Sequence, residues 1–185
     1  SEREILKQWL GPDHCRLVGV FALGGMGKTA LSIKVAQEMQ WEFDAVIWRS
    51  LRDAPLLTEF LPPLLALLGK EENFKPPENL NNQLSHLLNY LRQQKVLLVL
   101  DNFDALFAEQ GQAAQFQTGY EMYGELLTRV GEISHQSCLL LTSREKPLEM
   151  AALEGERLAV RSLNLKGLDE ASGQQLLKVQ GLPVF

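Results

Sequence analysis

The residues best suited to chemistry form a glycine-rich run, Ala22-Leu23-Gly24-Gly25-Met26-Gly27-Lys28-Thr29. Apolar residues before the run predict a buried strand, and apolar residues at helical spacing after it predict a helix. A turn of this kind aims backbone N–H groups and the positive end of the helix dipole at one point, which suits a polyphosphate. The Lys28 ammonium would meet the β and γ oxygens, and the Thr29 hydroxyl would hold Mg²⁺. The run therefore predicts a P-loop.

The first position of the usual P-loop spacing is glycine, and this chain has Ala22 there. Alanine is small enough to keep the turn possible, while Gly24, Gly25 and Gly27 allow positive φ and a close backbone approach. The alternative interpretation is a structural glycine-rich turn followed by a chance Lys-Thr pair.

A carboxylate that can hold Mg²⁺ ends a second apolar run. Asp101 follows Val96-Leu97-Leu98-Val99-Leu100, which is typical of a strand buried on both faces of a parallel sheet. In a P-loop protein, this is the place of the Walker B aspartate, which binds Mg²⁺ directly or through water. The alternative is an ordinary aspartate that caps a turn.

Hydrolysis also requires a group that orients or deprotonates the attacking water. The residue after Asp101 is Asn102, which cannot act as a base but can position water. Asp104 can take the role of base, or it can be the N-cap of a helical turn. We therefore expect slow hydrolysis, or hydrolysis controlled by a partner.

An arginine follows a third apolar strand, in the run Thr142-Ser143-Arg144. At the ligand edge of a parallel sheet, Arg144 can contact the γ-phosphate. The alternative is a surface arginine paired with Glu145 or Glu149.

Strands alternate with helices along the chain, which predicts an α/β doubly wound fold of the P-loop NTPase type. We expect a five-stranded, mainly parallel sheet between helices. The pattern predicts strands over 15–22, 45–48, 96–100, 137–142 and near 158–165. It predicts helices over 1–10, 28–40, 80–92, 120–133 and 169–180, two short helices or one kinked helix over 56–68 around Pro62-Pro63, and loops over 70–79 and 103–118.

Composition limits the classes of partner. The net charge of −5 and the absence of a basic run do not suggest nucleic acid, and no apolar run reaches membrane-spanning length. Cys15 and Cys138 begin apolar strands, so we expect buried free thiols and a cytoplasmic setting. The histidines lack the spacing of a metal site.

Taken together, these motifs resemble the NB-ARC (AP-ATPase) domain of the STAND class of signalling NTPases, in the form found in bacterial members. The resemblance rests on the P-loop, on Leu97-Leu98-Val99-Leu100-Asp101-Asn102 as Walker B, and on Leu139 to Arg144 as the sensor motif. Residues 1–6 are similar to the end of the family's GRExE motif, 43–51 to its second-strand motif, and 163–177 to its last core helix. The order of these motifs matches the family through most of the chain.

The resemblance implies a nucleotide-binding domain over 1–180, with 181–185 beginning a linker to a missing C-terminal helical domain. It implies an ADP/ATP-Mg²⁺ switch with slow ATPase activity. The implied catalytic residues are Lys28, Asp101, Asp104 and Arg144, and Thr29 and Asp101 would bind the metal. The implied nucleotide contacts are Arg3, Gly24, Gly25, Met26, Gly27, Lys28, Thr29 and Ala30.

The implied partners are adenine nucleotide and the other domains of a longer protein: a winged helix, a repeat sensor and an effector. A homo-oligomer would form when ATP is bound. Two other functions stay open, a non-catalytic nucleotide-binding scaffold and a P-loop small-molecule kinase. The kinase would need an arginine-rich lid, but Arg129 is the single arginine in 103–130. No Asn-Lys-x-Asp motif is present, which favours adenine over guanine.

Overall fold

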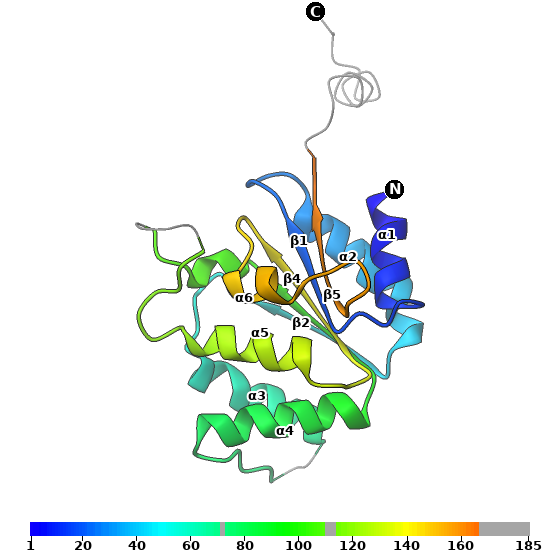
Figure 1. Cartoon of the computed structure of the whole chain (residues 1–185). Coiled ribbons are helices and arrows are strands. Elements are labelled where there is room, and N and C mark those ends of the chain that lie inside the picture. The colour runs from blue at the N-terminus through cyan, green and yellow to red at the C-terminus, as the bar shows by residue number, and fades with distance from the viewer. Residues whose placement is uncertain (71–72, 110–113, 167–185) are drawn as a thin grey trace, which may run out of the picture.

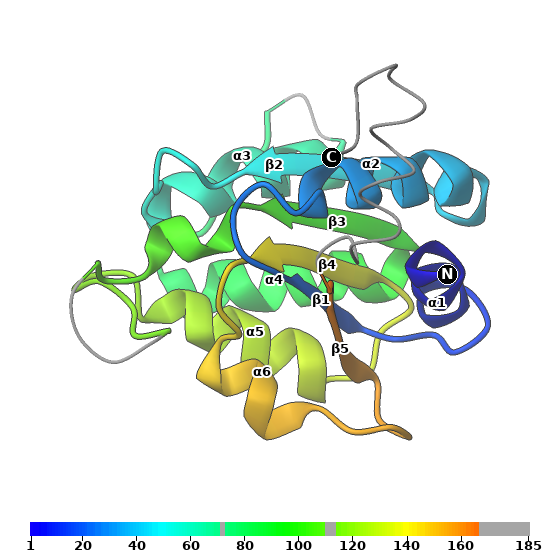
Figure 2. The same ribbon diagram turned by 90° about the horizontal axis from the view of Figure 1, so that it is seen from above.

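The computed structural model describes residues 1–70, 73–109 and 114–166. Its centre is a five-stranded sheet of β1 (Leu17–Phe21), β2 (Ala45–Ser50), β3 (Val96–Asp101), β4 (Cys138–Ser143) and β5 (Val160–Asn164). The strand order is β2-β3-β4-β1-β5, and every neighbouring pair is parallel. Figure 2 shows this order from β2 at the top to β5 at the bottom. The predicted fold class is confirmed.

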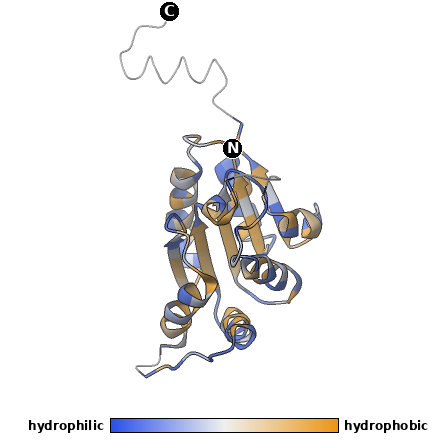
Figure 3. Cartoon of the chain, turned by 90° about the vertical axis from the view of Figure 1, so that its left-hand side faces the viewer, coloured by the Kyte–Doolittle hydropathy of each residue, from blue (hydrophilic) through white to orange (hydrophobic). Residues whose placement is uncertain are grey.

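The central strands are apolar on both faces because each face carries helices. Along β1, Leu17 and Phe21 belong to one apolar cluster, whereas Val18 and Val20 belong to the other. Side chains of a strand alternate between the faces of a sheet, so an unbroken apolar run fills two cores at once. Figure 3 shows the hydrophobic strands between the two helical layers.

Two helices cover one face, α1 (Glu2–Leu10) and α2 (Lys28–Met39). The other face carries α3 (Leu57–Gly69), α4 (Leu80–Gln93), α5 (Met122–Glu132) and α6 (Leu148–Leu153). Two short 3-10 helices, η1 (Gln40–Glu42) and η2 (Phe103–Leu106), follow α2 and β3. Figure 1 shows α1 and α2 together at one side of the sheet, away from α4 and α5.

The structure decides between the two alternatives predicted around Pro62-Pro63. The segment is one helix, α3, because its apolar face packs into the core and outweighs the two N–H groups that the prolines lack. Helix α6 was not predicted, since its six residues are too few for a clear helical period, although Met150 is fully buried. The predicted helix over 169–180 and the linker over 181–185 lie outside the described residues.

The two cysteines are buried and free, as predicted. Burial raises the pKa of the Cys15 thiol to about 11 and raises that of Cys138 well above its usual value. Within the described residues, no group of three His, Cys, Asp or Glu side chains could hold a metal ion. None of the described helices combines the length and the apolar character needed to span a membrane.

Candidate functional site

The predicted site residues meet at the carboxyl edge of the sheet. Phe21 of β1 lies opposite Ser143 of β4, and Leu100 of β3 lies opposite Leu141, so the three strands end at one level. The glycine-rich loop leaves β1 at this level, while Asp101 ends β3. Arg144 directly follows β4. Parallel pairing therefore brings together groups that are far apart in the sequence.

The loop has the conformation that its glycines allow. Gly25 and Gly27 have φ values of 78° and 81°, which residues with a side chain rarely adopt. No described atom lies within 4 Å of the point where a Cβ would stand on either glycine. Gly27 is the N-cap of α2, so the first N–H groups of that helix face the same space. The loop thus fits an anion such as a phosphate chain.

The Lys28 side chain folds back over the loop. Its Nζ donates hydrogen bonds to the carbonyl oxygens of Ala22 at 2.6 Å and Leu23 at 3.0 Å. Partial burial lowers the pKa of the Lys28 ammonium; the Asp104 and Asp101 carboxylates act against this, and the Arg144 guanidinium adds to it. Lys28 therefore lies close enough to Asp101, Asp104 and Arg144 for their charges to act on its pKa.

Asp101 is held by two hydroxyl groups. Thr29 Oγ1 donates to Asp101 Oδ1 at 2.8 Å, and Thr142 Oγ1 donates to the same oxygen at 2.5 Å. Thr142 also accepts a 3.1 Å hydrogen bond from the backbone N–H of Asn102, which has a left-handed φ of 60°. The hydroxyl of Thr142 thereby fixes both the carboxylate and the turn that follows it.

The donor set at Asp101 fits Mg²⁺. Both hydroxyl hydrogen bonds go to Oδ1, and no described residue hydrogen-bonds to Oδ2. Mg²⁺ is bound in proteins by one or two carboxylates, with water and phosphate oxygens completing its shell. A single buried carboxylate beside a threonine hydroxyl supplies that kind of partial shell.

Asp104 is not a helix cap. The N-cap of η2 is Asn102, whereas Asp104 lies inside η2 and turns its carboxylate to Arg144. Its Oδ1 accepts from the Arg144 backbone N–H at 3.1 Å, and its Oδ2 lies 3.3 Å from Arg144 Nε. Neither Glu145 nor Glu149 pairs with Arg144 among the described ion pairs. Asp104 as a catalytic base stays a prediction.

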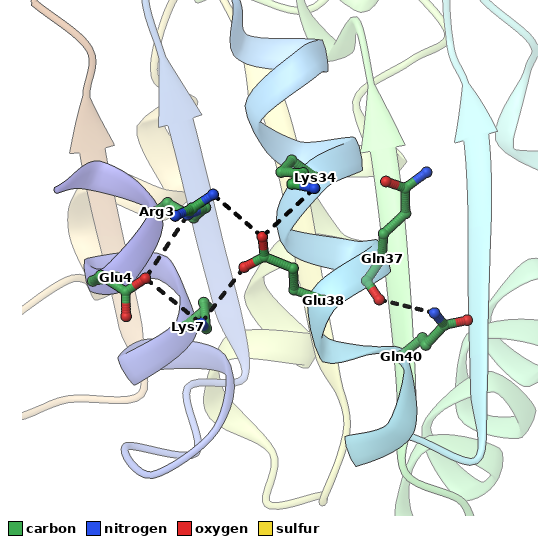
Figure 4. Close-up of polar contacts among 7 residues, drawn as sticks. All are labelled: Arg3, Glu4, Lys7, Lys34, Gln37, Glu38 and Gln40. Carbon is green, nitrogen blue, oxygen red and sulfur yellow. Dashed lines mark hydrogen bonds and ion pairs between the residues drawn. The ribbon is translucent and has the colours of Figure 1, made fainter.

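Arg3 is not brought to the loop. Its Nη1 lies 3.3 Å from Oε1 of Glu38, and Glu38 also lies within salt-bridge distance of Lys7 and Lys34 (Figure 4). Glu38 stands ten residues after Lys28 on α2, about 15 Å along a helix that rises 1.5 Å per residue. In this arrangement Arg3 links α1 to α2, and its predicted nucleotide contact stays a prediction.

Thr142 is the site residue that sequence reasoning left without a role. The sequence places it only within the sensor motif, yet its side chain is 1% exposed and hydrogen-bonds to Asp101 at the Walker B position. The available signal was a hydroxyl residue near the end of an otherwise apolar strand. Such a group must find a polar partner when it is buried.

The sheet order, the loop and the strand-end carboxylate define a P-loop NTPase. A model of the NACHT domain family matches residues 20–180, and the chain belongs to this family. Membership of the STAND class is thereby confirmed at the level of the NACHT family. The narrower NB-ARC assignment stays a prediction.

The chain is 39% identical over 189 residues to an uncharacterized WD repeat-containing protein of Nostoc sp.. The match covers 98% of this chain but 15% of that protein. The chain therefore spans a small part of a much longer relative, whose bacterial origin fits the predicted kind of family member.

Solved structures share the fold at low identity. Cdc6p from Pyrobaculum aerophilum has a TM-score of 0.65 and 14% identity over 95% of this chain and 48% of its own. The Aeropyrum pernix ORC1 protein, solved in complex with DNA, has a TM-score of 0.60 and 16% identity over 97% of this chain and 48% of its own. The A. pernix ORC2 protein, solved as ADPNP-ADP complexes, has a TM-score of 0.59 and 15% identity over 96% and 50%. These likenesses support the fold alone.

Proposed function

We propose that this chain is the nucleotide-binding core of a STAND-type signalling ATPase that binds ADP or ATP with Mg²⁺ as a conformational switch. The observation that carries the proposal is the contact of the P-loop Thr29 with the strand-end Asp101. It couples an open phosphate cradle to a carboxylate whose second oxygen has no hydrogen-bond partner among the described residues. Bound Mg²⁺ would neutralise charge on the phosphate oxygens.

The proposed roles of the side chains follow from their positions. The loop glycines and the start of α2 bind phosphate oxygens through backbone N–H groups, and Lys28 adds a cation. Thr29 and Asp101 hold the metal. Arg144 contacts the terminal phosphate, so that a triphosphate and a diphosphate make different contacts and favour different conformations.

We propose slow turnover because the position after Asp101 carries an amide. Asn102 cannot remove a proton from water, and both oxygens of Asp104 are engaged by Arg144. Slow hydrolysis suits a switch, because the chain then stays longer in its ATP-bound conformation. We also propose, from the motif resemblance, an NB-ARC-like mode of action in the cytoplasm. Its partners would be other domains of a longer protein, and it would assemble into a homo-oligomer with ATP.

Calorimetric titration of the 185-residue chain with ADP, ATP and GTP, with and without Mg²⁺, tests the proposal. Adenine-selective binding that Mg²⁺ strengthens is the expected result. Binding of adenine nucleotide without phosphate release over hours would favour the non-catalytic scaffold. Absence of binding by all three nucleotides would contradict the proposed site.

A further inference from the structure

Both carboxylate oxygens of Asp104 are directed to a single residue. Oδ1 accepts from the backbone N–H of Arg144 at 3.1 Å, and Oδ2 lies 3.3 Å from its Nε. The Asp104 side chain is 19% exposed, whereas that of Arg144 is 66% exposed. Asp104 is thus anchored in the protein, and Arg144 projects from it toward solvent.

The guanidinium of Arg144 is only partly engaged. Its Nε lies in the ion pair with Asp104, and neither Nη atom makes a hydrogen bond among the described residues. Nε also lies 4.0 Å from the position that a Cβ on Gly24 would take, so the side chain passes beside the glycine-rich loop. The two Nη groups form the fork with which arginine binds phosphate.

We propose that Asp104 is a positioning residue, which fixes Arg144 so that its Nη fork can contact the terminal phosphate of a bound nucleoside triphosphate. The inference rests on the proposed function, which it deepens. A long, exposed arginine loses much rotamer entropy when it contacts a ligand, and an ion pair formed in advance at Nε removes part of that loss. Asp104 therefore increases the preference for ATP over ADP through Arg144.

A double-mutant cycle separates positioning from the direct effect of the Asp104 charge. The ratio of ATP to ADP affinity is measured by titration with fluorescent nucleotide analogues for the unchanged chain, Asp104→Ala, Arg144→Ala and the double variant. Repulsion between Asp104 and phosphate acts whether or not Arg144 is present. Positioning acts only when Arg144 is present.

We expect Asp104→Ala to lower the ATP-over-ADP ratio about 3- to 30-fold in the chain with Arg144 and to leave it unchanged in the Arg144→Ala background. Asp104→Asn keeps an acceptor for the Arg144 N–H, so it should retain more of the preference than Asp104→Ala. Thermal unfolding without nucleotide checks that every variant is folded. If Asp104→Ala does not fold, Asp104→Asn takes its place in the double-mutant cycle.

Two results overturn the inference while leaving the proposed function intact. One is an unchanged ratio in both Asp104 variants, which would make Arg144 independent of its anchor. The other is an equal change with and without Arg144, which would assign the effect to the Asp104 charge. Failure of the unchanged chain to bind either nucleotide is a separate result, because it overturns the proposed function as well.

Discussion

Thr29 and Asp101 are joined by a 2.8 Å hydrogen bond although 72 positions separate them in the sequence. The bond connects the first turn of α2 to the last residue of β3, which are the two elements that a P-loop site needs to hold together. It places a hydroxyl beside a carboxylate whose second oxygen is free of described partners. The pair thereby supplies the two side chains proposed to hold Mg²⁺.

Asp101→Asn should abolish the effect of Mg²⁺ on nucleotide affinity. The amide has no negative charge and offers a weaker ligand to a hard cation, although it keeps an oxygen acceptor for the two threonine hydroxyls. Calorimetric titration with ATP in magnesium and in EDTA measures the effect. An undiminished Mg²⁺ dependence in the variant would place the ion elsewhere.

Lys28→Ala should weaken nucleotide binding by about 2–3 kcal/mol, because a charge-assisted contact with phosphate is lost. The matched control is Lys34→Ala on the same helix, since Lys34 is exposed and pairs with Glu38 instead of facing the loop. We expect near-normal affinity for the control. Equal loss in both variants would indicate a general effect of helix charge and would count against the P-loop role of Lys28.

Thr142→Val should destabilise the fold by about 1–3 kcal/mol, because it leaves the part-buried backbone N–H of Asn102 without its acceptor and removes a donor from the buried Asp101 carboxylate. Thr142→Ser keeps the hydroxyl and should stay closer to the unchanged chain. Urea unfolding monitored by tryptophan fluorescence compares the two. If Thr142→Val had the same free energy of unfolding as Thr142→Ser, the hydrogen bonds of Thr142 would not stabilise the site.

The parts of the site that could be predicted depend on local sequence. The loop conformation follows from its glycines, and the burial of β3 follows from five consecutive apolar residues. The partners of Thr142 and Arg144 could not be predicted, because they depend on which strands lie side by side and at what register. The choice between one helix and two at Pro62-Pro63 could not be made for a related reason, since tertiary packing of the apolar face outweighs a local preference.

Gly27→Ala should destabilise the chain in the absence of nucleotide by about 1–2 kcal/mol, which is the cost of a left-handed conformation for a residue with a Cβ. Space is not the reason, since no described atom lies within 4 Å of that Cβ position. Gly24→Ala is the control, because Gly24 is outside the positive-φ region. Similar thermal unfolding of both variants would contradict the backbone argument.

His135 should make the fold less stable in mildly acidic solution. Its Nε2 lies 2.9 Å from the Val130 carbonyl oxygen and its Nδ1 accepts a 3.1 Å hydrogen bond from the Ser137 N–H, so the neutral ring with hydrogen on Nε2 satisfies both contacts. Protonation of Nδ1 would remove the second bond. Burial, together with the charges of Arg16 and Arg92, lowers the pKa of His135 below its usual 6.5 despite the opposing hydrogen bond to Val130.

The sign of the pH effect follows from that lowered pKa. Between the folded-state pKa and 6.5 the unfolded chain binds more protons at His135 than the folded chain does, so the free energy of unfolding rises with pH in this window. The contribution is fully present above 6.5 and is lost as the pH falls toward the folded-state value. Urea unfolding from about pH 5.5 to pH 7.5 should show this slope in the unchanged chain and a smaller one in His135→Gln, which cannot titrate. Equal slopes in the two proteins would show that other groups, and not the buried imidazole, determine stability in this range.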